Sequence, residues 1–249
     1  MLVTVDKVFE QLLAGQLEPL SYKVFDGLNS AQRKQYSCQS TLVRLVEDWK
    51  RSLDDNHTVG ASSTDMSKAF DCLSPDLLLS KLQAYVLCSN SLAMLKSYFT
   101  NRKNRVRLGD TCGEWKAVKR GCPQGSSLGQ VLWNFYQNDL FYENIRSQLS
   151  AYAKDHEIYI SGEKIDNVVS SIEEDENTTG RWHKSNYLSG NPSKYQVLVM
   201  SRAKKEVKKA VPIDSHTIRQ AQEIKFDENH RLTRLEKCQF FDFLNFFFL

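Results

Sequence analysis

Apolar residues along the chain repeat at two spacings, one typical of helices and one typical of strands. Residues 40–53 carry apolar side chains at helical spacing behind the hydroxyls of Ser37 and Ser40, either of which suits an N-cap, so an amphipathic helix is expected there. The Ser-Pro-Asp run at 74–76 is a typical helix start, because it joins a capping hydroxyl, a first-turn proline and an acid near the positive end of the helix dipole. Similar patterns predict further helices around residues 92–99, 128–141 and 165–172.

Strand patterns lie between these helices. Residues 149–160 alternate on both sides of Lys154-Asp155, which predicts a β-hairpin with its turn at those two residues. A Gly-Asp pair at 109–110 predicts a second turn between two strands. The other expected strands are residues 58–65, 106–108, 115–118 and 195–199. Helices and strands mixed in this way, without internal repeats, predict an α+β domain.

Composition places the chain among ordinary globular proteins. It has 249 residues, of which 41% are hydrophobic and 25% charged, and this length is enough for a substantial core. The net charge is only +3, so overall charge gives no argument for nucleic acid. Two basic clusters change this picture locally, since each could either meet phosphates or form a solvated surface. They comprise Arg102, Lys103, Arg105 and Arg107, and Arg202, Lys204, Lys205, Lys208 and Lys209.

Several classes of protein are excluded by what the sequence lacks. None of the six cysteines forms a C-x-x-C pair and the five histidines have no metal-ligand spacing, which argues against zinc sites and disulfide frameworks. The first residues include acids, with no cleavage site after an apolar run, so no secretory signal is expected. No apolar stretch approaches the roughly 20 residues that span a bilayer. We therefore expect an intracellular protein, in the cytoplasm or nucleus, without a membrane partner.

Three short segments carry residues suited to chemistry. Residues 65–71 (Asp-Met-Ser-Lys-Ala-Phe-Asp) end an expected strand, residues 121–129 form a glycine-rich loop that opens a helix, and residues 152–155 (Tyr-Ala-Lys-Asp) cover the expected hairpin turn. Taken singly, each is more often a helix cap or a turn than a site. Their order and spacing within one mixed chain are far more specific.

These segments resemble the reverse transcriptase domain of non-LTR (LINE-type) retrotransposons. The family pattern has an Asp followed by S-K-A-F-D, then G-V-P-Q-G-S-x-L-G-P, Y-A-D-D and N-P-x-K. The matching runs here are D-M-S-K-A-F-D at 65–71, G-C-P-Q-G-S-S-L-G-Q at 121–130, Y-A-K-D at 152–155 and N-P-S-K at 191–194. The similarity covers roughly residues 1–201 and begins with a segment like the family's fingers helix.

The resemblance implies a polymerase palm, which is an antiparallel sheet with helices packed on one face. We expect partial fingers at residues 1–60, the palm at 61–201 and a degenerate tail at 202–249, with no thumb. The implied activity is RNA-directed DNA polymerisation with an RNA template, a DNA primer, deoxynucleotides and Mg²⁺. Such enzymes use two Mg²⁺ ions about 3.5–4 Å apart to stabilise the attacking and leaving oxygens.

The resemblance also implies roles for individual residues. Asp65 matches the first metal ligand, and Asp155 matches the second aspartate of the family's hairpin pair. Phe70 matches the residue that packs beneath the incoming sugar, and Lys194 matches the lysine near the leaving pyrophosphate. The remaining nucleotide-binding positions are Gln124 and Gly125, in the loop that lines the nucleotide and template, and Arg33, a looser match to a fingers arginine near the triphosphate.

One departure from the family pattern falls on the metal site. Lys154 stands where the family has the first aspartate of its pair, so an ammonium replaces an expected ligand. Unit charges about 4 Å apart interact by about 4 kcal/mol at an effective dielectric near 20, and a divalent ion roughly doubles this. We therefore expect weakened Mg²⁺ binding and an inactive reverse transcriptase copy. The alternative is a remnant that binds nucleic acid without catalysis.

Further departures predict decay at several places. Residues 62–64 (Ser-Ser-Thr) occupy a strand that is apolar in the family, so weaker burial is expected there. Gln130 replaces a proline, and Gly180 in a helical stretch costs about 1 kcal/mol relative to alanine. After Lys225 the family's primer-gripping L-G-V run is missing and the pattern dissolves into a phenylalanine-rich end, which reads as unselected sequence.

Overall fold

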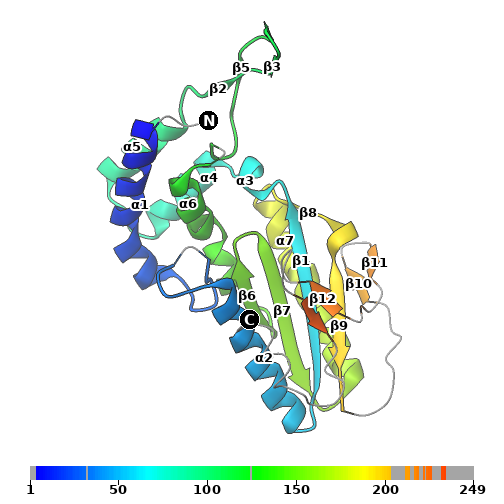
Figure 1. Ribbon diagram of the computed structural model, residues 1–249. Helices are drawn as coiled ribbons and strands as arrows, with labels where there is room; N and C mark the ends of the chain where they lie inside the picture. The colour runs from blue at the N-terminus through cyan, green and yellow to red at the C-terminus, as the bar shows by residue number, and fades with distance from the viewer. Residues whose placement is uncertain are drawn as a thin grey trace, which may run out of the picture.

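An antiparallel sheet built around strand β1 (Thr58–Ser67) organises the molecule (Figure 1). The computed structural model describes residues 4–31, 33–123, 125–202, 211–213, 216–218, 221, 223–225 and 231–233. β1 lies between β7 (Asp155–Gly162) and β9 (Gln196–Met200), and both neighbours run antiparallel to it. β6 (Gln148–Tyr152) pairs with β7, and β8 (Ser189–Gly190) pairs with the end of β1. The expected antiparallel sheet is therefore confirmed.

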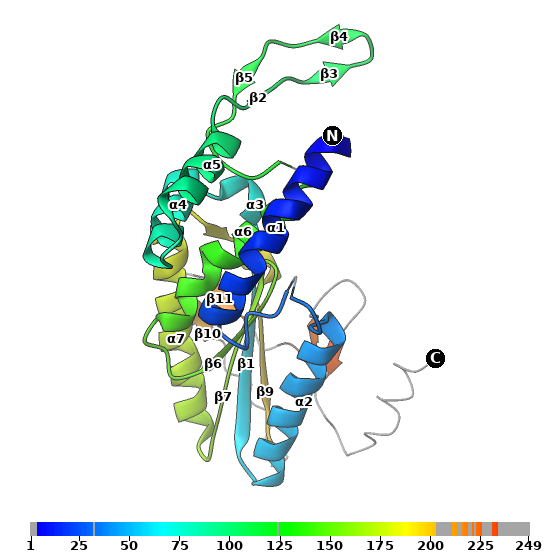
Figure 2. The ribbon, with the colours of Figure 1, turned by 90° about the vertical axis from the view of Figure 1, so that its left-hand side faces the viewer.

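Helices surround this sheet in the order that the apolar spacing predicts. The palm helices α6 (Ser127–Gln137) and α7 (Ile165–Ser185) lie on one face, and α2 (Cys38–Asp54) covers part of the opposite face (Figure 2). α7 continues well beyond the expected residues 165–172 and includes the acidic residues 173–176 and Gly180. The other helical segments are α1 (Thr4–Val24), α3 (Ala69–Cys72), α4 (Pro75–Ala84), α5 (Ser89–Phe99) and the 3-10 turns η1 (Asn138–Tyr142) and η2 (Pro192–Lys194).

Local capping chemistry explains where α2 begins. The Ser37 side chain accepts a hydrogen bond from the Ser40 backbone N–H, and the Ser40 hydroxyl accepts one from the Ser37 backbone N–H. The two serines that the sequence offered as alternatives therefore form one reciprocal cap. By contrast, Ser74 occupies the N-cap of α4 without a side-chain hydrogen bond, and Pro75 supplies the first turn.

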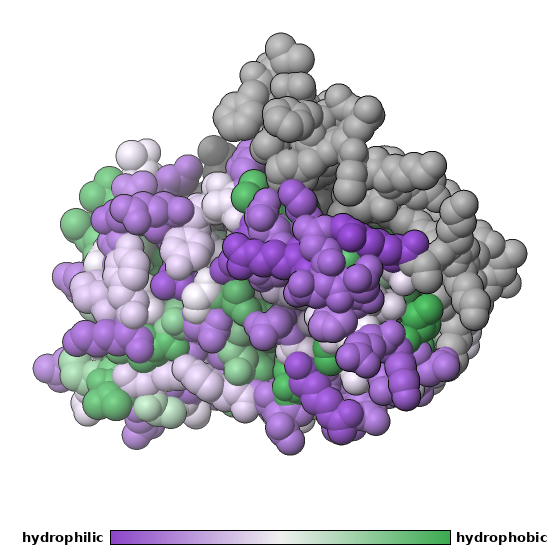
Figure 3. All heavy atoms as spheres, turned by 90° about the horizontal axis from the view of Figure 1, so that it is seen from below, coloured by the Kyte–Doolittle hydropathy of each residue, from purple (hydrophilic) through white to green (hydrophobic). Residues whose placement is uncertain are grey.

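Two buried clusters fill the space on either side of the sheet. The smaller one lies under α2 and includes Leu45, Trp49, Ala61 and Leu198. The larger one joins α6, α7 and the other helices to the opposite face of the sheet. Seen from below, the visible part of the lower end is mostly hydrophilic, with scattered hydrophobic residues (Figure 3). Among the described residues, no helix has the length and apolar character needed to cross a membrane.

The hairpin formed by β6 and β7 has its turn one residue earlier than the sequence predicted. Tyr152 pairs with Asp155, so the turn consists of Ala153 and Lys154, and Asp155 is the first residue of β7. Ala153 adopts a positive φ of 55°, the conformation that tight two-residue hairpin turns require. An alanine gives no signal for that conformation, which explains why the sequence placed the turn at Lys154-Asp155.

The segment between α5 and the glycine-rich loop forms a projecting arm, defined here as residues 103–117. The expected turn at 109–110 is present, between β3 (Arg107–Leu108) and β4 (Thr111–Cys112). Residues 115–118 do not pair with 106–108 as expected; instead β5 (Lys116–Ala117) pairs with β2 (Lys103–Asn104). The arm is therefore two short ladders in succession, and it extends away from the body of the molecule (Figure 2).

The chain after Met200 is described only in part. Two short antiparallel pairs are present: β10 (Val211–Ile213) with β11 (His216–Ile218), and β12 (Glu223–Lys225) with β13 (Arg231–Thr233). The expected basic cluster at 204–209 and the phenylalanine-rich end lie outside the described residues.

The expectation of weak burial at residues 62–64 is wrong. Ser62 is 0% exposed, and Ser63 and Thr64 are buried as well. Buried acids accompany the two serines: Ser62 lies with Glu176 of α7, and Ser63 with Glu157 of β7. The polar side chains of this strand are therefore buried beside polar side chains from elements distant in the sequence.

These buried acids make the stability of the fold depend on pH. Burial raises the pKa of Glu176 to about 7, although the hydroxyls of Ser62 and Thr179 partly offset it. Burial also raises the pKa of Glu157 to about 8. A carboxyl whose pKa is higher in the folded state than in the unfolded chain binds more protons when folded. Its contribution to stability is therefore complete below the unfolded pKa and is lost as pH rises towards the folded pKa.

We expect Glu176→Gln to stabilise the protein at pH 7–8 relative to the parent chain. The neutral amide removes the cost of ionising a buried carboxyl, which is on the order of 3 kcal/mol for a shift from 4.5 to about 7. Urea unfolding at pH 4.5 and pH 8 measures the difference. The advantage of the variant should be small at pH 4.5 and grow with pH. Glu174→Gln, an exposed change on the same helix, serves as the control, and an equal pH profile for both variants would contradict the prediction.

Candidate functional site

Two carboxylates meet where β1 ends. Asp65 is the partner of Asp155 in the β1–β7 ladder. Residues directly opposite each other in antiparallel strands have Cα atoms only about 4.5–5.5 Å apart. The structure therefore brings these two sequence-predicted residues together at one end of the strands, as the order of strand and hairpin indicates. This end of the sheet is called the carboxylate edge below.

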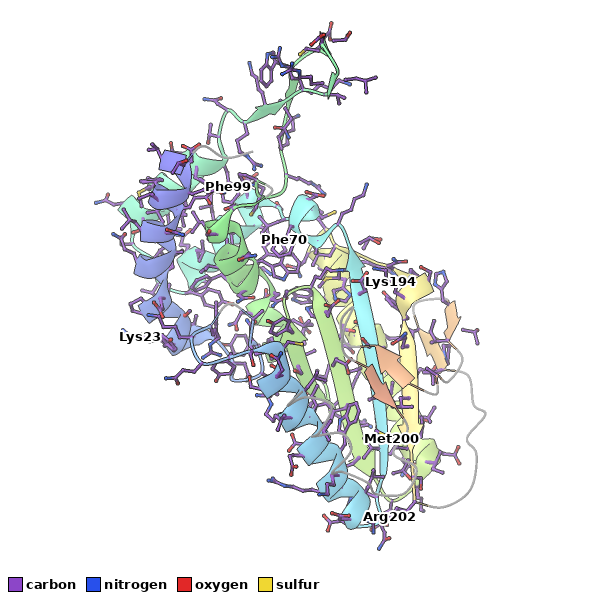
Figure 4. All side chains as sticks on the ribbon, viewed as in Figure 1. Lys23, Phe70, Phe99, Lys194, Met200 and Arg202 are labelled. Atoms are coloured by element: carbon purple, nitrogen blue, oxygen red, sulfur yellow. The ribbon has the colours of Figure 1, made fainter. Side chains whose placement is uncertain are left out.

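Two lysines hold the Asp65 carboxylate. Lys154, in the hairpin turn, is ion-paired with Oδ1 of Asp65. Lys194 places its Nζ 3.1 Å from Oδ2, and it comes from η2 on the other side of β1 (Figure 4). The backbone fixes this approach, because the Asn191 N–H donates to the Asp65 carbonyl at 2.9 Å. The Asp65 side chain is only 13% exposed, whereas Lys154 remains 40% exposed.

The two carboxyls differ in pKa. Burial alone would raise the pKa of Asp65, but hydrogen bonds from Lys154 and Lys194 outweigh it and hold that pKa below its ordinary value. Burial raises the pKa of Asp155 to about 6, and the neighbouring Asp65 carboxylate adds to the rise while Lys154 opposes it. Both carboxyls are therefore mainly ionised at neutral pH, and Asp155 is the first of the two to take up a proton as the pH falls.

Phe70 lies one short helical turn beyond β1. Lys68 adopts a positive φ of 50° and turns the chain into α3, which carries Phe70. The Phe70 ring packs against Trp133 of α6 with 5.3 Å between centroids. The indole N–H of Trp133 in turn donates to the Ala153 carbonyl at 2.7 Å. Trp133 thus links Phe70 to the hairpin turn, a connection that its apolar helical context did not reveal.

The glycine-rich loop is bonded to the same segment. The Gly121 N–H donates to the Leu73 carbonyl at 2.7 Å, and the Cys122 N–H to the Phe70 carbonyl at 3.0 Å. Gly121 has a φ of +75°, and an added Cβ would lie 2.8 Å from the Asp71 backbone, so only glycine fits. Gly125 is exposed with a φ of +80°, and Gln124 lies outside the described residues.

Helix α1 anchors the end of this loop through a residue that the sequence did not single out. The buried Glu10 carboxylate accepts hydrogen bonds from the Tyr98 hydroxyl at 2.8 Å and from the Ser127 N–H at 3.0 Å. Ser127 is the first residue of α6, where free N–H groups favour an anion. Ser126 caps the same helix through the Gly129 N–H. The N-terminal helix therefore fixes where the loop ends.

Arg33 makes its contacts elsewhere. Its Nη1 donates to the carbonyls of Asp26 and Asn29 at 2.8 and 3.1 Å, and its guanidinium lies 4.6 Å from the centre of the Tyr36 ring. These bonds hold the loop between α1 and α2. Of the contacts described for Arg33, none joins it to the carboxylate edge.

A strand that ends in one carboxylate, a hairpin whose second strand begins with another, and a glycine-rich loop bonded to the segment between them define the palm of a template-directed polymerase. The chain belongs to the reverse transcriptase (RNA-dependent DNA polymerase) family, whose model matches residues 1–241. The expected family is therefore confirmed.

Its relatives come from insect non-LTR transposons. The probable RNA-directed DNA polymerase from transposon BS of Drosophila melanogaster is 26% identical over 203 residues, which are 78% of this chain and 22% of that protein. A putative 115 kDa protein in the type-1 retrotransposable element R1DM of the same species is 32% identical over 129 residues, or 48% of this chain and 12% of that protein. The chain thus spans about a fifth or less of the length of these relatives.

Solved structures confirm the palm fold. Telomerase from Candida tropicalis, in complex with a TWJ fragment of telomeric RNA, aligns with a TM-score of 0.60 at 13% identity, covering 91% of this chain and 38% of that one. The apo telomerase from the same organism, truncated from the C-terminal domain, gives a TM-score of 0.59 at 12% identity, covering 91% and 43% of the two chains.

Proposed function

We propose that this chain is the fingers-and-palm region of a retroelement reverse transcriptase in which RNA-directed DNA synthesis is lost. The observation that carries this proposal is the ion pair between Lys154 and Asp65. Asp65 and Asp155 are the proposed Mg²⁺ ligands, and Lys154 occupies the position of a third carboxylate in the family pattern. An ammonium therefore sits where that pattern supplies a ligand.

The charges at this edge do not fit a pair of Mg²⁺ ions. Mg²⁺ takes hard oxygen ligands, usually one or two carboxylates with phosphates and water. Here both oxygens of Asp65 already face ammonium groups, from Lys154 and Lys194. Among the described residues, no group of three or more histidine, cysteine, aspartate or glutamate side chains gathers in a way that could hold a metal. The two carboxylates and two ammonium groups neutralise one another.

The repulsion between the Lys154 ammonium and a bound Mg²⁺ ion has a definite order of magnitude. A unit charge about 4 Å from a divalent ion contributes on the order of 8 kcal/mol at an effective dielectric near 20. Lys154 is 40% exposed, so solvent screens much of this and a few kcal/mol remain. Because about 1.4 kcal/mol corresponds to a factor of ten in rate, even the screened value removes most activity.

The other residues keep their proposed roles around a nucleotide. Phe70 is proposed to pack beneath the sugar, supported by the Trp133 ring behind it. Gln124 and Gly125 are proposed to line the nucleotide and template. Lys194 is proposed to lie near the pyrophosphate, although here it is drawn onto Asp65. Arg33 can act at the triphosphate only if it breaks its hydrogen bonds to the two loop carbonyls.

Primer extension tests the loss of synthesis. With a primed RNA template, deoxynucleotides and Mg²⁺, the chain should give no product above background, at least about 100-fold below an active reverse transcriptase, since a few kcal/mol of lost stabilisation has that effect. An active reverse transcriptase on the same template is the positive control. Sustained extension by the unmodified chain would overturn the proposal.

Binding of nucleic acid without catalysis is the second candidate function. It is favoured by the exposed basic residues from Lys103 to Arg107. Contacts with phosphates release counterions, so the affinity for a primed RNA template should be weak and should fall steeply between 50 and 200 mM salt, by roughly ten-fold or more. A gel-shift titration measures this. An affinity that stays flat with salt, or no binding at low salt, would identify these charges as a solvated surface only.

A further inference from the structure

The arm and the residues at its base together carry an excess of positive charge. Residues 102–120 contain seven basic and two acidic side chains, in a chain whose net charge is only +3. Every residue of the arm itself, from 103 to 117, is exposed. Two ladders of two residue pairs each bury almost nothing, and an isolated two-stranded hairpin is only marginally stable in water. Packing among the described residues therefore does not explain the residues of the arm.

An aromatic ring stands among these charges. Trp115 is 58% exposed, and the guanidinium of Arg105 lies 4.6 Å from its ring centre. Val106 and Leu108, on the same arm, are more exposed still. A large ring that is open to solvent and flanked by cations suits a partner that offers both flat faces and negative charge. Unpaired bases and their phosphates offer both.

The base of the arm leads directly into the glycine-rich loop. At its base, the Val118 N–H donates to the Arg102 carbonyl, and the Arg102 guanidinium donates to the Arg120 carbonyl and lies over the Phe99 ring. The chain then enters the glycine-rich loop at Gly121 directly. In Figure 4 the arm projects above Phe99, and Phe70 and Lys194 lie lower in the body of the molecule.

We propose that the arm binds single-stranded nucleic acid, with a base stacked on Trp115 and phosphates held by Lys103, Arg107 and Lys116. The excess of positive charge favours a polyanion. The exposed ring favours a single strand, whose bases are free to stack, over a duplex. This inference deepens the second candidate function, because it names the surface and the strand. It does not depend on metal binding at Asp65.

Fluorescence anisotropy with the whole chain and a single-stranded RNA oligonucleotide tests the proposal. Trp115→Ala should weaken binding by about 5-fold to 100-fold, as expected for loss of one stacked base, while Trp115→Phe should retain most of the affinity. Lys103→Ala with Arg107→Ala should lower the slope of log affinity against log salt by about 1.4. The matched control removes the same charge from the N-cap and the last turns of α7, through Lys164→Ala with Arg181→Ala, and should leave that slope unchanged. Unaltered thermal unfolding shows that each variant is folded.

The outcomes separate this inference from the function it deepens. Binding by the parent chain with unchanged affinity in Trp115→Ala would overturn the assignment of the arm but leave nucleic-acid binding intact. No binding by the parent chain at low salt would overturn both. Equal affinity for duplex RNA would contradict stacking on Trp115. Single-stranded DNA of the same sequence, included as a parallel probe, should bind to a similar extent, since stacking and phosphate contacts do not involve the 2′-hydroxyl.

Discussion

Replacing Lys154 by aspartate should raise the affinity of the sheet edge for Mg²⁺ by about 100-fold or more, yet leave the chain almost unable to extend a primer. The substitution removes a repulsive charge beside Asp65 and adds a ligand in the hairpin turn. Each of these changes is worth several kcal/mol before screening, at about 4 kcal/mol per pair of unit charges. Titration calorimetry with Mg²⁺ measures the first half of the prediction, and primer extension on RNA measures the second.

Restored metal binding is not enough, because catalysis also requires that the reacting groups are correctly aligned. The primer end must lie in line with the phosphate, and small displacements cost about 100-fold. Lys194 still holds one oxygen of Asp65. Lys154→Ala removes the ammonium without adding a ligand, so it separates these two effects. Lys164→Asp makes the same change of residue at an exposed position away from the site and serves as the control. Robust extension by Lys154→Asp would mean that Lys154 is the only lesion, which would contradict decay at several places.

Trp133→Ala should lower the free energy of unfolding by about 3–5 kcal/mol, the usual cost of deleting a fully buried large aromatic side chain. The ring supports Phe70, and its indole N–H is bonded to the hairpin turn at Ala153. Trp133→Phe keeps most of the packing and loses only that hydrogen bond, so about 1 kcal/mol is expected. Urea unfolding measures both variants.

A second tryptophan provides the matched control for this prediction. Trp115→Ala removes a ring of the same type from the exposed arm, where surface substitutions usually change stability by less than about 0.5 kcal/mol. If Trp133→Ala and Trp115→Ala cost the same, the link between α6 and the hairpin would carry no particular weight. Faster amide exchange at Lys154 in Trp133→Ala is the additional result expected from a loosened turn.

The sequence best predicted those features that depend on residues close together along the chain. The starts of α2 and α4 follow from Ser37, Ser40 and Pro75, because caps and first-turn prolines act within a few residues. The meeting of Asp65 with Asp155 also followed from the sequence, since a strand and a hairpin in this order share an edge of one antiparallel sheet.

What the sequence missed depends on partners far along the chain. Ser62 reads as a defect in a buried strand until Glu176, on a helix more than a hundred positions later, is placed beside it. Glu10 and Ser127 give no joint signal, although one caps the helix that begins with the other. The hairpin turn was misplaced by one residue because Ala153 adopts a conformation that alanine rarely takes.

The central place of β1 has a consequence for how the chain is made. Ala61 pairs with Tyr159 on one side and with Leu198 on the other, so both neighbours of this strand leave the ribosome long after it does. Until then β1 has two open edges, and open edges are templates for pairing with other chains. Pairings between such distant segments also form slowly. A message cut short before β9 would yield a sheet in which one edge of β1 is open, and such a fragment should aggregate rather than persist as a smaller palm.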